Sequence, residues 1–187
     1  MKRRAFSTAL TALVALAASG AARADLPPAT ALPPEVLREL PGARVQGSGR
    51  MRYFGFHIYD ARLFAAGDPV GADWAAAPLA LELQYGRAFD GADIAERSLA
   101  EMRRQGEIAA ATGERWLAAM KSLFPDVRAG DRITGLLHPD GRTRIFHNGQ
   151  PRGEVRDADF TRLFFGIWLS PRTSDPALRN ALLGGPR

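Results

Sequence analysis

The stretch RMRYFGFHIYDARLF, residues 50–64, decides how the rest of the chain can fold. Its aromatic content favours extended strands, with aromatic side chains on both faces. Gly55 interrupts it and predicts a bulge or bend, so we expect one strand near residues 44–52 and another over 53–65. The arginines in this stretch pose a question, because a buried strand offers no ready place for a guanidinium group.

The next strand is easier to predict, because LALELQY at residues 79–85 alternates regularly. One face of this strand carries Leu79, Leu81, Leu83 and Tyr85. The other face carries Ala80, Glu82 and Gln84. Leucines on a single face predict a strand that packs one side against a hydrophobic layer.

Helices and hairpins follow along the chain. Asp90 and Thr112 are placed to begin helices over residues 91–105 and 113–124, and Pro125 stops the second. Turn residues then predict a series of hairpins, at Pro139-Asp140-Gly141 and at Asn148-Gly149, with a short last strand near residues 152–156. The final helices begin at Asp157 and Asp175, and Gly184 ends the last one.

This order of elements predicts an α+β fold, a large antiparallel sheet with a layer of helices packed on it. We expect one domain over residues 43–184. An extended, proline-rich lead-in precedes it over residues 25–42, with about one turn of helix near its end.

The first 24 residues read as a secretory signal. MKRR is positively charged, residues 5–18 are apolar but too short to span a bilayer, and Ala22-Arg23-Ala24 has the small-x-small pattern of a cleavage site. We therefore expect cleavage after Ala24, a periplasmic or secreted protein, and no membrane span in the mature chain.

The charge balance argues against nucleic acid as a partner. Four of the 25 basic residues lie in the signal, which leaves 21 basic against 20 acidic residues in the mature chain. A nearly neutral chain lacks the excess positive charge on which affinity for nucleic acid depends.

Several kinds of chemistry are missing from the sequence. There is no cysteine, no phosphate-binding loop, no dinucleotide fingerprint and no nucleophile elbow, so we expect no cofactor. The histidines, at 57, 138 and 147, lie on different strands without carboxylates at ligand spacing, so no metal site is expected. His138 and His147 flank one hairpin, where they could face each other as surface residues.

The arginines have two interpretations. Counted along one strand, Arg50 and Arg52 share a face with Phe54, while Arg87 continues the face of Leu83 and Tyr85. A guanidinium on an apolar face needs a carboxylate, carbonyl oxygens or a ligand anion, which favours the mouth of a cleft. Alternatively, Gly55 reverses the alternation and the arginines reach water at the sheet edge.

A family resemblance sharpens the first interpretation. GSGRMRYFGFHIYDARLF resembles the opening strand pair of the chalcone isomerase-like family, and the resemblance continues through LELQYGRAFDGADIAERSLAEM, FPDVRAGDRITG, IFHNGQPRGEV and the C-terminal helices. It covers nearly all of residues 43–184 and is strongest to the exported bacterial branch. It implies an open-faced β-sandwich with a cleft between sheet and helices. Some members of the family close chalcones to flavanones, and others bind fatty acids.

The enzyme's residues do not carry over well. The resemblance places Phe89 where the catalytic tyrosine stands, and Phe54 where a polar residue precedes the shared glycine. It places Glu96 or Arg97 at the helix amide. Arg44 is the nearest match to the catalytic arginine, with Arg50 or Arg52 as candidates in a shifted register.

We therefore predict a protein that binds a small hydrophobic acid, either fatty-acid-like or phenolic. A non-catalytic role is favoured over an enzymatic one. The alternatives are an isomerase of the chalcone type, with a hydroxyl from Tyr53, Tyr59 or Tyr85, and an envelope protein with a filled interior. The predicted ligand-binding residues are Arg50, Arg52, Phe54, Tyr59, Tyr85, Arg87, Phe89 and Arg97.

Overall fold

The sheet is the central feature of the computed structural model, which describes residues 31–185. The predicted signal peptide, residues 1–24, and the start of the lead-in lie outside the described residues. Every strand pairs antiparallel with its neighbours in the chain, so the order across the sheet is the order in the sequence. The strands are β1 (Ala43–Tyr53), β2 (Phe56–Ala66), β3 (Leu79–Tyr85), β4 (Arg132–Leu137), β5 (Arg142–His147) and β6 (Gln150–Arg156).

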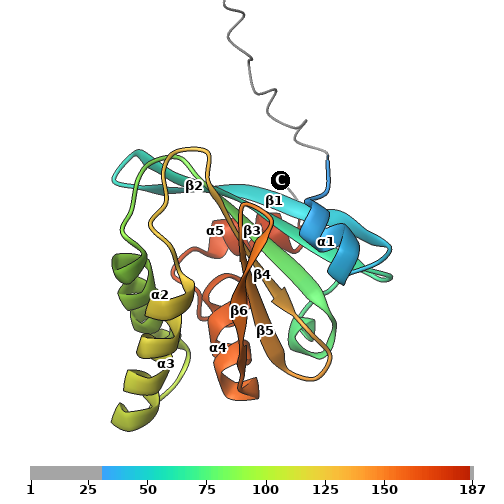
Figure 1. Cartoon of the computed structure of the whole chain (residues 1–187). Helices are drawn as coiled ribbons and strands as arrows, with labels where there is room; N and C mark the ends of the chain where they lie inside the picture. Colours follow the sequence, from blue (N-terminus) through green and yellow to red (C-terminus); the bar gives the residue numbers. More distant parts are fainter. Residues whose placement is uncertain (1–30, 186–187) are drawn as a thin grey trace, which may run out of the picture.

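One face of the sheet carries most of the helices (Figure 1). They are α2 (Gly91–Gln105), α3 (Ala110–Leu123), α4 (Ala158–Leu169) and α5 (Pro176–Leu182). The short helix α1 (Pro34–Glu39) packs on the opposite face, and a 3₁₀ turn, η1 (Trp74–Ala76), lies between β2 and β3. The predicted α+β class, an antiparallel sheet under a helical layer, is confirmed.

The two faces of the sheet have separate hydrophobic clusters. The larger lies under the helical layer and includes Leu81 and Leu83 with side chains of all four helices. The smaller gathers Val36 of α1 with Phe64 and Ala80. Alternation along β3 therefore sends its leucines to one cluster and Ala80 to the other, as the sequence predicts.

Two hairpins close with the same two-residue turn. Phe54 and Gly55, between β1 and β2, have φ values of 47° and 82°; Asn148 and Gly149, between β5 and β6, have 49° and 83°. Positive φ at both central positions is the turn whose twist matches that of the flanking strands. The Asn-Gly turn is confirmed, whereas Gly55 forms part of a hairpin turn and is not a bulge within a strand.

This turn corrects the count of faces around Gly55. Arg50 and Arg52 lie on β1, and the chain reverses before Phe56, so alternation cannot be counted from one strand into the next. The register also shifts between Met51 and Arg52, where the hairpin contains an irregularity. The irregularity and the turn therefore interrupt the single strand face that the sequence predicted for Arg50, Arg52 and Phe54.

The helix starts agree with the sequence in part. The carboxylates of Asp157 and Asp175 accept hydrogen bonds from the backbone N–H of Phe160 and Leu178, as expected of N-caps. Asp90 occupies the N-cap position of α2 but makes no such bond. The predicted start of α3 after Thr112 is wrong, because Ala110 and Ala111 favour the helix and extend it backwards.

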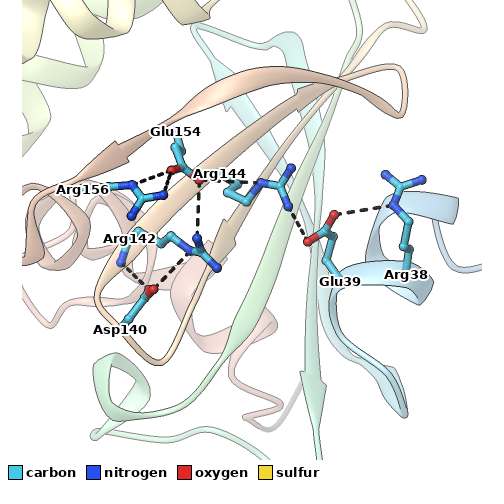
Figure 2. A network of polar contacts seen from close by, with 7 residues as sticks. All are labelled: Arg38, Glu39, Asp140, Arg142, Arg144, Glu154 and Arg156. Carbon is cyan, nitrogen blue, oxygen red and sulfur yellow. Dashed lines mark hydrogen bonds and ion pairs between the residues drawn. The ribbon is translucent and has the colours of Figure 1, made fainter.

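Acidic partners hold Arg142, Arg144 and Arg156 of β5 and β6 (Figure 2), whereas Arg152 donates to the carbonyl oxygen of Leu123. Arg144 bonds to Glu39 of α1 at 2.6 Å, and Arg156 bonds to Glu154 at the same distance. Arg142 lies 3.3 Å from Asp140. Nearer the middle of the sheet, the buried Glu82 lies 2.7 Å from Arg62 and 3.4 Å from Arg132. Among these ion pairs, the one between Arg144 and Glu39 fastens α1 to the sheet, on the face away from the other helices.

Candidate functional site

A cavity of about 350 Å³ lies between the sheet and the helical layer. Its walls are mostly apolar, and its volume falls in the range of sites for small organic ligands. Strand, helix and loop residues contribute to it, among them Met51, Tyr59, Leu83, Ile94, Ser98 and Trp168. A hydrophobic pattern in the sequence is compatible with a filled interior as well as with a cleft, and the structure has the cleft.

Half of the predicted site residues line this cavity. They are Tyr59, Tyr85, Phe89 and Arg97. The aromatic rings of the first three form a continuous wall, since Tyr85 packs edge-on against both neighbours, with ring centres 6.0 Å from Tyr59 and 5.8 Å from Phe89. The structure therefore brings together residues from β2, β3, the following loop and α2.

The other four predicted residues, Arg50, Arg52, Phe54 and Arg87, lie outside the lining. Arg50 is paired with Asp60 across the hairpin at 2.6 Å, and Arg52 reaches the carbonyl oxygen of Gly55 at 3.4 Å. Phe54 is 84% exposed. Arg87 stands over the rings of Phe56 and Phe89. A direct role for these four in ligand binding stays a prediction.

The cavity tyrosines are held in the neutral form. The indole N–H of Trp168 donates to the hydroxyl oxygen of Tyr59 at 3.0 Å. Burial raises the pKa of Tyr59 to about 12, although the bond from Trp168 opposes the shift. Burial also raises the pKa of Tyr85, and Tyr59 adds to this effect. Both side chains therefore keep an O–H that can be donated to a ligand oxygen.

Arg97 is the only basic side chain in the cavity lining within residues 31–185. It bonds to Glu101 at 2.6 Å, and Arg104 approaches the other oxygen of Glu101 at 3.4 Å. The spacing of four residues alone predicts an exposed ion pair on the helix surface, but the side chain of Glu101 is only 9% exposed. Asp175, also in the lining, is engaged as the N-cap of α5.

Most of the lining consists of residues that are not among the predicted site residues. Ile94 and Ser98 lie on the face of α2 that forms part of the cavity wall. Met51 of β1 and Trp168 of α4 also line the cavity. The available signal was Ser98, a small polar residue on an otherwise apolar helix face, which bonds back to the carbonyl of Ile94 and leaves room beside it.

Two expected absences concern histidines and the membrane. His147 pairs with Ile133 on β4, and His138 bonds to Arg142 beyond the other end of that strand, so the two do not face each other. Over the described residues, no group of three His, Asp or Glu side chains is placed to hold a metal. Within the same part of the chain, every helix is too short or too polar to cross a bilayer.

Comparison with known families decides what kind of protein contains this cavity. Residues 44–184 match the family described as chalcone isomerase-like. The chain belongs to this family. A relative in Haemophilus influenzae, an uncharacterized protein, is 27% identical over 138 residues, which are 74% of this chain and 66% of that protein. The chain thus spans about two thirds of the relative's length.

A solved structure shows the same fold. The crystal structure of an Arabidopsis thaliana fatty-acid binding protein matches with a TM-score of 0.62 at 15% sequence identity, over 77% of this chain and 88% of that one. The chalcone isomerase-like fold is therefore confirmed. Phe89, which the resemblance places at the catalytic tyrosine, lines the cavity without a hydroxyl, and Phe54 lies on a hairpin turn outside it.

Proposed function

We propose that this chalcone isomerase-like protein is a non-catalytic carrier that binds a small hydrophobic acid, fatty-acid-like or phenolic, in the cavity between sheet and helices. One observation carries the proposal: an apolar cavity of about 350 Å³ has, in the lining that residues 31–185 provide, a single basic side chain, Arg97. An acid could place its apolar part inside and its negative group beside this guanidinium. The fatty-acid binding protein with the same fold supports this ligand class.

Apolar burial accounts for most of the expected affinity. A tail of about ten methylenes contributes roughly 8 kcal/mol in gross terms, at about 0.8 kcal/mol for each. Arg97 adds less than a buried cation would, because its side chain is 59% exposed and shares its charge with Glu101. Association and ordering then reduce the total, so a dissociation constant of about 1 μM is expected.

The charged and hydroxyl groups fit binding better than catalysis. A phenol with a pKa of about 12, as in Tyr59, stays protonated near neutral pH and cannot act as a general base there. Glu101 is already engaged by two arginines. The two tyrosine hydroxyls can instead donate hydrogen bonds to a carboxylate, carbonyl or phenolic oxygen of a bound molecule.

Export of the protein is a further part of the proposal. The signal-like character of residues 1–24 supports a periplasmic or secreted carrier. In that compartment, an apolar acid with low solubility would need a protein to hold it away from water.

The test separates the role of the charge from that of the cavity. We would measure binding of dodecanoic acid and of the matching alcohol, dodecanol, by titration calorimetry. Substituting Arg97→Gln should lower the affinity for dodecanoic acid by roughly three- to tenfold and leave the affinity for dodecanol nearly unchanged. The reason is that only the acid interacts with the cation.

Arg104→Gln is the matched control. Arg104 contacts the same glutamate but lies outside the cavity lining, so its loss should change neither affinity. The proposal is wrong if the parent binds neither molecule and no apolar acid is retained on purification from the periplasm. If Arg97→Gln lowers the affinities for acid and alcohol equally, the charge of Arg97 does not contribute to ligand recognition.

A further inference from the structure

The β1–β2 hairpin ends in three exposed aromatic side chains. Tyr53 is 51% exposed, Phe54 84% and Phe56 62%, and we call these residues the aromatic tip. They surround the turn at the end of the longest hairpin, which Figure 1 shows at the upper left of the sheet, far from α1. Single exposed apolar residues are ordinary on protein surfaces, but three on one turn form a patch that calls for an explanation.

Phe54 is the residue that folding explains least. Its φ of 47° lies in the left-handed region, where a bulky side chain is disfavoured and asparagine or glycine is preferred. Asn148 occupies the equivalent position of the β5–β6 turn at nearly the same angle. The ring of Phe54 lies edge-on to that of Tyr53, with ring centres 4.5 Å apart, and is otherwise largely exposed. The chain accepts both backbone strain and an exposed ring at one position, which points to a use outside folding.

Unneutralised arginines surround the aromatic tip. Within residues 31–185, the guanidinium of Arg52 bonds to a carbonyl oxygen, that of Gly55, and has no carboxylate partner. Arg87 stands over the ring of Phe56 at 5.4 Å, and within residues 31–185 it has no carboxylate partner. Arg50, on the same hairpin, is paired with Asp60, which His57 also approaches at 3.3 Å. The tip therefore combines apolar rings with nearby arginines, Arg52 and Arg87, whose charge is not balanced by a carboxylate within residues 31–185.

We propose that the aromatic tip docks on an anionic lipid surface, with Phe54 entering the boundary between headgroups and acyl chains. Aromatic rings and arginines partition well to that boundary, since an apolar body enters it while a charged end remains with the headgroups. Clustered arginines close to the surface are attracted by anionic lipid. A convex turn of this size offers much less than the roughly 800 Å² per partner of a standard protein interface, whereas a bilayer deforms around it.

The position of the tip gives the docking a purpose. Tyr53 belongs both to the tip and to the cavity lining, and Arg87 bridges from Phe56 to Phe89 of the cavity wall. Docking would therefore bring the mouth of the cavity to the membrane, where apolar acids are found. That purpose depends on the proposed function, but the docking itself does not.

The test measures vesicle binding in the absence of any ligand. We would use the chain from residue 25 onward, because residues 5–18 are apolar and would bind lipid themselves. All the contacts described above lie within residues 31–185, so this chain keeps its fold. Binding to vesicles of phosphatidylglycerol with phosphatidylethanolamine is followed by flotation and compared with vesicles of phosphatidylcholine alone.

The decisive variant is Phe54→Asn, which copies the residue of the other turn. It should raise the melting temperature or leave it unchanged, while weakening binding to the anionic vesicles by roughly tenfold or more. The double substitution Arg52→Gln with Arg87→Gln should weaken binding and reduce its sensitivity to salt. Leu37→Asn, at a residue of α1 that is 56% exposed, is the matched control and should bind as the parent does.

Two results would overturn the docking. One is a parent chain that does not bind anionic vesicles. The aromatic tip would then be explained by a protein partner. The other is a Phe54→Asn variant that binds as well as the parent. The vesicles contain no ligand, so the vesicle test and the dodecanoic acid test are independent. Failure of one proposal would not affect the result for the other.

Discussion

The β1–β2 and β5–β6 hairpins have the same turn and opposite surroundings. Their φ angles at the two turn positions agree to within a few degrees, at 47° and 82° in one and 49° and 83° in the other. In the β5–β6 turn, Asn148 uses both ends of its amide, accepting from the backbone N–H of Arg132 at 2.8 Å and donating to Asp131 at 2.9 Å. In the β1–β2 turn, Phe54 makes no hydrogen bond with its side chain and faces water.

Most arginines of the two hairpins have carboxylate partners, including Arg50 with Asp60 and Arg62 with Glu82 on the β1–β2 hairpin. Arg142, Arg144 and Arg156 of the β5–β6 hairpin are paired with Asp140, Glu39 and Glu154 (Figure 2), whereas Arg152 of β6 donates to the carbonyl oxygen of Leu123. On and beside the β1–β2 hairpin, Arg52 and Arg87 have no carboxylate partner within the described part of the chain. One hairpin follows the rules of stable turns, and the other departs from them next to a cavity mouth. Such local departures are where function is expected to be found.

The largest predicted effect comes from moving the phenylalanine to the other turn. Asn148→Phe should lower the free energy of unfolding by about 2–4 kcal/mol, since it loses two hydrogen bonds and places a bulky residue at positive φ. Denaturation with urea would measure the loss. An effect as small as that expected for Phe54→Asn would show that the sequence of this turn matters little and would weaken the comparison.

Charge removal should have a smaller effect, and it should differ between the hairpins. Glu154→Gln takes the carboxylate from Arg142, Arg144 and Arg156 and should cost about 1 kcal/mol, less in 1 M salt, because these pairs are partly exposed. Arg52→Gln should change stability by less than about 0.5 kcal/mol. Thermal melts at low and high salt measure both. Equal losses would mean that the tip arginine is also structural.

The sequence predicted the sheet and the helical layer because their patterns are local. Alternation along 79–85 and the capping aspartates at 157 and 175 each need only a few neighbouring residues to be recognised. The conformation at Gly55 was harder to predict, because a glycine among aromatics fits a bulge as well as a turn. Phenylalanine at the first turn position is also not a residue from which a hairpin turn is predicted.

The site could be predicted only in part. Tyr59, Tyr85, Phe89 and Arg97 reach the cavity, although they come from four separate segments. Arg50 and Arg87 were selected because an unpaired arginine on a strand is costly to bury. The sequence does not show that Asp60 pairs with the first across the hairpin, or that aromatic rings lie under the second. Partners across strands depend on register, which the irregular β1–β2 pairing obscured.

The smallest predicted effect is a pH dependence confined to the β5–β6 turn. The side-chain bond from Asn148, helped by the backbone N–H of Arg128, holds the pKa of Asp131 below its usual range. A lowered pKa stabilises the fold at pH values above the unfolded value of about 3.9, and this stabilisation is lost as the pH falls through the folded value.

Asn148→Ala should therefore cost more at pH 7 than at pH 3, by a few tenths of a kcal/mol, because Asp131 is partly exposed. Urea denaturation at the two pH values measures the difference, and the same substitution in an Asp131→Asn background is the control. There the cost should not depend on pH, since only backbone strain and a neutral hydrogen bond remain. If the cost in the parent is equally independent of pH, the amide of Asn148 stabilises the turn through its geometry alone, and the charge of Asp131 has no part in the contrast between the two hairpins.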